Sequence, residues 1–270
     1  MRTFSKLVEQ VSFVDSLKSN SIHHVYETLN GTGKELLPMS LKIVIFAAIS
    51  WMICIFSVNN WYVFPIVASV IVVVIIIGYF RSSLYFRKAA YTMAVYLFMQ
   101  TALIFYIASL EISGSNVINR IVALLYILLM YGLSFYVIQI KLIENVQTKY
   151  LADDGKQIKK KRTIKLVKVL STVLVSFIIV VIAVMQFYRV NKWWIDGSNY
   201  EFLSGFNGTL IGTVLSAVFV FIGITALILI TLLPTLLLDA SVVVDGYIYK
   251  KYAENYRVEY EFTEEEWYGK

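Results

Sequence analysis

Six long stretches of almost continuously apolar residues predict membrane-spanning helices. They cover residues 41–58, 61–80, 89–110, 117–139, 166–188 and 210–238. A helix needs about 20 mostly apolar residues to cross a hydrocarbon core about 30 Å thick, because each residue rises about 1.5 Å. The pattern therefore predicts an all-α polytopic integral membrane protein. Residues 1–40 precede the six-helix domain at 41–239, and residues 240–270 form a tail.

The first segment has a different pattern, with apolar residues at helical spacing and charged residues elsewhere on the surface. The apolar positions are Phe4, Leu7, Val8, Val11, Val14 and Leu17. This spacing predicts an amphipathic helix, and no long apolar core with a small-residue cleavage site marks a signal peptide. The helix has two interpretations: it lies on the inner membrane surface, or it packs against the protein's own cytoplasmic loops.

The tail at 240–270 carries seven acidic residues and contains conflicting patterns. Asp245-Gly246 between apolar runs is typical of a hairpin, and the strict alternation from Arg257 to Phe262 is typical of a half-buried strand. The same residues could also extend the last helix into the cytoplasm. Helix and strand both remain open for residues 241–262. We also expect this acidic tail to dock on a basic loop near residue 160.

Composition and charge position restrict the class of protein further. With 59% apolar and 16% charged residues, the chain is neither a soluble enzyme with one core nor a disordered segment. Its single cysteine, Cys54, excludes a disulfide framework. With the N-terminus inside, 21 of the 24 Lys and Arg residues lie on the cytoplasmic side, as the positive-inside rule requires. We therefore predict a multi-pass cell-membrane protein with both termini cytoplasmic.

A run of four cations follows the fourth stretch, at Lys159, Lys160, Lys161 and Arg162. Such a run can bind anionic lipid headgroups of the lipid bilayer. It can also be a topology signal only, because positive charge is retained in the cytoplasm. Few aromatic residues lie between the cations, so the run does not predict a nucleic-acid partner.

The only sizeable outer loop, at residues 188–208, mixes aromatic and polar residues. Trp193, Trp194, Asp196 and Tyr200 are its candidates for contact with a partner protein, because Trp and Tyr dominate contact energies at interfaces. The same residues also suit an aromatic belt at the membrane surface. Closer to the last stretch, Gly212 and Ser216 form a small-xxx-small pair that favours close helix packing.

Residue patterns of known catalytic sites are missing from the sequence. It has no HExxH, GxSxG or P-loop motif, and its two histidines, His23 and His24, are adjacent and point about 100° apart on a helix. We therefore expect no enzymatic activity, no catalytic residue, no bound metal and no cofactor. Polar residues inside the stretches are interpreted as hydrogen bonds between helices. They are Ser50, Cys54, Ser69, Gln100, Thr101, Ser134, Ser171, Thr172, Ser176, Gln186, Ser216 and Thr225.

In its span count, short outer loops and cytoplasmic termini, the chain resembles polytopic membrane proteins of Gram-positive bacteria encoded beside secreted toxins or bacteriocins. These include immunity proteins of type VII secretion loci. The resemblance implies a non-enzymatic accessory protein that engages a membrane-acting toxin through the outer loop or the bundle and prevents pore formation. The alternative is a permease subunit energised by a separate ATPase, since the stretches carry no central ionisable group for ion coupling.

Overall fold

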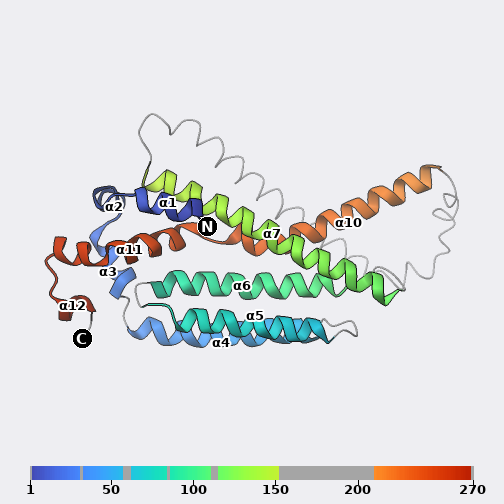
Figure 1. The fold of residues 1–270 in the computed structure, drawn as a ribbon, viewed down its shortest axis with the longest axis horizontal. Helices are drawn as coiled ribbons and strands as arrows, with labels where there is room; N and C mark the ends of the chain where they lie inside the picture. The colour runs from blue at the N-terminus through green and yellow to red at the C-terminus, as the bar shows by residue number, and fades with distance from the viewer. Residues whose placement is uncertain are drawn as a thin grey trace, which may run out of the picture. The chain divides into compact units, whose positions relative to one another are not determined.

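A computed structural model describes residues 2–30, 33–56, 62–83, 86–110, 115–151 and 210–268 of the chain (Figure 1). Every regular element within these ranges is a helix. The chain divides into two compact units, Met1–Lys160 with Pro234–Lys270 and Lys161–Leu233. The helix packing described for α1 to α7 and α11 lies within the first unit. The division of the sequence at residues 40 and 239 stays a prediction.

Five regions of the described part are long and apolar enough to cross a membrane, and together they indicate a membrane protein. They are Leu37–Ile55, Val63–Phe80, Arg87–Ala108, Asn116–Lys149 and Thr225–Glu259. Each overlaps one of the predicted stretches, so five of the six are confirmed as apolar helices. The sixth, at residues 166–188, lies outside the described residues. The number six and the cytoplasmic placement of both termini therefore stay predictions.

Three of these helices form one packed bundle, α4 (Gly33–Phe56), α5 (Val63–Phe80) and α6 (Arg87–Ala108). Each packs against both of the others, and Figure 1 shows them side by side. Their shared core includes Ile43 from α4, Val72 from α5 and Phe98 from α6. The helices form because their residues are apolar almost throughout, and they pack because small residues such as Ala47 and Ala94 allow close approach.

The fourth helix, α7 (Asn116–Lys149), continues ten residues beyond its predicted end at Gln139. Leu142 and Val146 on this extension are buried in the core of the first unit. The prediction stopped where charged residues begin, at Lys141. Burial of one face of the helix carries it further, because packing stabilises a helix more than its intrinsic propensity does.

A break at residues 238–239 separates α10 (Leu210–Leu237) from α11 (Ala240–Glu259). The Asp239 carboxylate caps α11 by accepting from the Ser241 N–H at 2.9 Å. At the other side of the break, the Lys141 ammonium donates to the carbonyl oxygens of Leu236 at 2.9 Å and Leu238 at 2.6 Å. A cation at a helix C-terminus satisfies carbonyls that have no helical partner.

The N-terminal segment forms three short helices rather than one, α1 (Arg2–Gln10), α2 (Phe13–Ser19) and α3 (Ile22–Asn30). The first break occurs at Ser12, whose hydroxyl accepts from the Asp15 N–H at 3.1 Å in a capping box. Helix α1 packs along α7, as Figure 1 shows, and α2 and α3 pack on α11. Phe4 and Val11 are buried there. The segment therefore packs against other helices of the chain, α7 and α11, and its position at the inner membrane surface stays a prediction.

The tail is helical, so the hairpin and strand interpretations are wrong. Helix α11 runs through Asp245-Gly246 and includes Arg257, and the short α12 (Glu264–Tyr268) follows a turn in which Glu261 has φ 57°. An isolated strand needs a neighbour for its backbone hydrogen bonds, whereas α11 packs on α6, α7, α2 and α3. Trp267 at the end of the tail is fully buried against Phe262, with ring centroids 5.3 Å apart.

Candidate functional site

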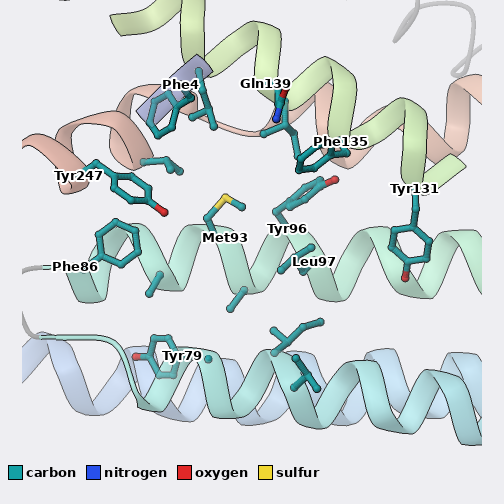
Figure 2. Close-up of a pocket in the computed structure, with 18 residues that line it drawn as sticks. Phe4, Tyr79, Phe86, Met93, Tyr96, Leu97, Tyr131, Phe135, Gln139 and Tyr247 are labelled. Atoms are coloured by element: carbon teal, nitrogen blue, oxygen red, sulfur yellow. The ribbon is translucent and has the colours of Figure 1, made fainter. Parts of the chain in front are cut away.

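Residues of α1, α5, α6, α7 and α11 line an apolar cavity of about 470 Å³ (Figure 2). This volume lies within the range of about 300–1,000 Å³ found for small-molecule sites. Met93 and Leu97 project into it from α6, and Phe135 faces them from α7. Gln139 and several tyrosines contribute the few polar atoms of the wall. Such a lining accepts an apolar chain, because it offers little that would replace the hydration of a polar ligand.

Aromatic rings form one end of the cavity, at the beginning of α6. The Tyr247 ring lies 5.4 Å from that of Phe4 and 4.7 Å from that of Phe86, both as edge contacts. Two cations lie over the faces of aromatic rings in this wall. The Arg87 Cζ atom is 5.5 Å from the centroid of the Tyr79 ring, and the Lys250 Nζ atom is 5.7 Å from that of Phe86. At these distances the ring faces attract the charges.

Next to this cavity, whose wall includes Tyr96, uncharged polar side chains connect α6, α7 and the end of α10 in what we call the neutral cluster: Tyr96, Gln100, Ser134 and Thr235. The Gln100 amide donates to the Ser134 hydroxyl at 2.9 Å and accepts from the Thr235 hydroxyl at 3.1 Å. Tyr96 and Thr235 share a further hydrogen bond of 3.3 Å. All four residues are buried.

Other polar residues within the spans also bond between helices. Ser50 donates to the Phe98 carbonyl at 2.9 Å, and Tyr131 donates to the Thr101 hydroxyl at 2.9 Å. The Trp51 indole donates to Ser69 at 2.9 Å. These contacts confirm, for the described residues, the prediction that such side chains join helices.

A second group, which we call the charged cluster, joins α2, α7 and α11 through Asn20, Lys149, Tyr150, Asp245 and Tyr249. Asp245 is buried and accepts from the Lys149 ammonium and the Tyr150 hydroxyl, each at 2.7 Å. Asn20 donates to the Tyr150 oxygen at 3.0 Å and accepts from Tyr249 at 2.9 Å. Burial and the neighbouring Asp245 charge raise the pKa of Tyr150, so its hydroxyl remains a donor at neutral pH.

These polar contacts give structural roles to two aspartates and place one histidine beside the charged cluster. Asp239 caps a helix, and both oxygens of Asp245 accept hydrogen bonds from α7 and the residue after it. The His24 ring lies 6.2 Å from the Tyr249 ring, at the edge of the charged cluster. Within the described ranges, no group of three or more His, Cys, Asp and Glu side chains could hold a metal ion.

The contact residues proposed from the sequence lie outside the described residues. They are Trp193, Trp194, Asp196 and Tyr200 of the outer loop and Lys159, Lys160, Lys161 and Arg162 of the basic run. Docking of the tail on that run stays a prediction for the same reason. Gly212 and Ser216 belong to α10, but their side chains are not described, so their packing role also stays a prediction.

The cavity and its cations were missed by the sequence reasoning. One signal was present, since Tyr79 and Phe86 flank a short basic connection between two apolar stretches. The contribution of Phe4 and Tyr247 carried no such signal, because these residues are far from it in sequence.

No protein-family model, no curated protein and no solved structure matches the chain. Functional inference therefore depends on its own residues.

Proposed function

We propose that the protein is a non-enzymatic membrane accessory protein that acts by protein contact, with immunity against a membrane-acting secreted toxin as its specific role. The observation that supports contact is the use of its buried polar groups. Gln100, Lys141 and Asp245 each bind other parts of the same chain and hold helices in place. A bundle crosslinked in this way is a rigid support from which loops can present a recognition surface.

In this proposal the outer loop supplies the contact, through Trp193, Trp194, Asp196 and Tyr200. Trp and Tyr contribute large apolar area at low conformational cost, and an acidic side chain selects for a cationic partner. Many membrane-acting peptides carry a Lys- and Arg-rich face, so the loop chemistry suits such a partner.

The test is protection of a sensitive cell. The chain is expressed in a strain that is killed by a membrane-acting secreted toxin, and survival and membrane potential are measured after exposure. We expect protection by the natural chain and its loss in a Trp193→Ala, Trp194→Ala variant present at the same level in the membrane. Tyr136→Ala, which removes an exposed aromatic side chain from α7, is the matched control. Unprotected cells, or equal protection by the loop variant, would contradict the proposal.

The proposed topology places both termini in the cytoplasm and the outer loop outside. Because Cys54 is the only cysteine, a Cys54→Ser background allows single cysteines to be introduced at Ser5, Asn199 and Glu265. A membrane-impermeant thiol reagent added to whole cells should label position 199 only. Labelling of position 5 or 265 before lysis would overturn the orientation.

A further inference from the structure

The connection between α5 and α6 contains two buried polar atoms without a hydrogen-bond partner, the Ser83 hydroxyl oxygen and the Arg87 Nε atom. The N–H of Phe86, the residue before Arg87, donates to the Ser83 carbonyl at 3.0 Å, so Ser83 lies close to the beginning of α6. Both atoms are hydrogen-bond donors, and one carries a positive charge. Buried donors of this kind are normally satisfied, so the pair indicates an acceptor that is an anion.

The surroundings of this turn also favour an anion. Arg87 is the first residue of α6, whose N-terminus has no side-chain cap, and the N-terminal end of a helix carries partial positive charge. Lys250 of α11 stands on the Phe86 ring, which adds a second cation from another element. No carboxylate in the described part of the chain forms an ion pair with Arg87 or Lys250.

The apolar cavity begins at the same residues. Tyr79 and Phe86, the two rings on which the cations stand, line its wall together with Tyr247. From there the cavity extends along α6 past Met93 and Leu97, as Figure 2 shows. A ligand that suits both parts has an anionic head and an apolar chain joined directly.

We propose that the polar atoms at the beginning of α6 and the adjoining cavity form a binding site for an anionic phospholipid, with the phosphate at Ser83, Arg87 and Lys250 and one acyl chain in the cavity. The phosphate accepts from the Ser83 hydroxyl and the Arg87 guanidinium, and Lys250 contributes charge. A free phosphate would leave the adjoining apolar cavity unused, and a zwitterionic lipid would bring a second, cationic headgroup beside Arg87 and Lys250. This inference goes beyond the proposed contact function and does not depend on it.

The experiment is native mass spectrometry of the purified full chain in mild detergent, titrated with dioctanoyl phosphatidylglycerol or dioctanoyl phosphatidylcholine. The two probes have the same chains and differ in net charge. We expect phosphatidylglycerol to bind at least fivefold more tightly. Arg87→Gln and Lys250→Gln should each weaken its binding about fivefold or more, which is the order expected for one cation at a lipid surface. Lys88→Gln, which removes an exposed charge from the next position of α6, is the matched control and should have little effect.

A second variant tests the chain-binding part with all charges retained. Met93→Trp fills the middle of the cavity and should weaken phosphatidylglycerol binding, while its unfolding temperature shows that the bundle still forms. Added inorganic phosphate should compete weakly or not at all. The assignment would be overturned by equal affinity for the two lipids. It would also be overturned if Lys88→Gln lost as much affinity as Arg87→Gln, or if phosphate competed while Met93→Trp bound the lipid unchanged. Lys250 is exposed on α11, so its variant remains informative if Arg87→Gln does not fold.

Discussion

The neutral cluster and the charged cluster perform the same task, joining helices through buried polar groups, with different chemistry. The neutral cluster of Gln100, Ser134 and Thr235 uses amide and hydroxyl groups in the middle of apolar helices. The charged cluster uses an ion pair between Lys149 and Asp245 at the end of α7, next to the N-terminal helices. A charge in the middle of a bilayer is costly, whereas the end of a span lies near water and headgroups. The position along the helices thus determines whether a charged group can be accommodated or only an uncharged polar one.

The two clusters also differ in what they join. The neutral cluster connects long apolar helices that already pack through their own side chains. The charged cluster attaches α2, the middle one of three short N-terminal helices, and isolated helices of fewer than about 12 residues are marginal in water. Its bonds include Asn20 to Tyr249, and a separate contact between Ser16 and Tyr256 also holds α2 to α11. We therefore expect the charged cluster to be the more sensitive of the two.

The largest effect is expected for Asp245→Ala. The substitution leaves the Lys149 ammonium and the Tyr150 hydroxyl without their acceptor, and removal of one member of a buried pair costs about 3 kcal/mol or more. Unfolding in mild detergent measures the loss, and limited proteolysis should show release of α1 to α3. Glu259→Ala removes an exposed carboxylate from the same helix and should change stability by less than about 0.5 kcal/mol. Equal stability of the two variants would contradict the ranking of the clusters.

Gly246→Ala tests the close approach of α11 to α6 that positions Asp245. A Cβ at residue 246 would lie 2.6 Å from the Ala89 Cβ, so the helices must separate. We expect a loss of about 2 kcal/mol, as for overpacked cores. At Gly132 of α7 a new Cβ meets nothing within 4 Å, and Ala there should stabilise by about 0.5–1 kcal/mol. If both variants shifted the unfolding midpoint in the same direction, the close contact would not be limiting.

Gln100→Leu is expected to have a smaller effect, because the neutral cluster supports helices that pack without it. Hydrogen bonds between membrane helices contribute about 0.6 kcal/mol on average, and this residue makes two, so the loss should be about 1 kcal/mol. The adjacent Met99→Leu, at an exposed position, is the control for the same unfolding measurement. A loss equal to that of Asp245→Ala would show that the two clusters do not differ.

The smallest effect concerns Glu266, which accepts from the Thr263 N–H at 3.0 Å and the Thr263 hydroxyl at 2.9 Å. These bonds lower the pKa of Glu266 below its ordinary value. The folded pKa lies below the unfolded one, so the stabilisation is complete above about pH 4.5 and is lost as the pH falls through the folded pKa. The protection factors of the α12 amides, which correct for the intrinsic pH dependence of hydrogen exchange, should decrease below that pH in the natural chain.

Glu266→Gln should remove this pH response, because glutamine does not titrate in this range. The neighbouring exposed Glu265→Gln should retain it. If the pH response persisted unchanged in Glu266→Gln, a group other than Glu266 would be its cause.

The apolar helices were predictable from the sequence because their composition alone determines their state. The break at Ser12 was also readable, since Ser12 followed by Asp15 is a capping signal that the apolar periodicity concealed. The helical structure of the tail was not predictable from the sequence. Asp245-Gly246 is normally a turn. It is helical here because Lys149 forms an ion pair with Asp245 and because Gly246, which has no Cβ, packs closely against Ala89. The cavity with its cations was equally hidden, because Phe4, Tyr79 and Tyr247 meet only through tertiary packing.

The bonds between α1 and α11 have a consequence for synthesis. The Lys251 ammonium donates to the Val8 and Val11 carbonyls at 3.0 and 3.1 Å, partners separated by more than 200 positions. At about 5–20 residues per second, the ribosome reaches Lys251 some tens of seconds after Val11. Helix α7, against which α1 packs, is complete well before then, so in the remaining interval it is the carbonyls of Val8 and Val11 that lack their partner from α11. The first segment to be made is thus among the last to be secured, and any chain interrupted before residue 240 exposes apolar side chains that quality-control proteases and chaperones recognise.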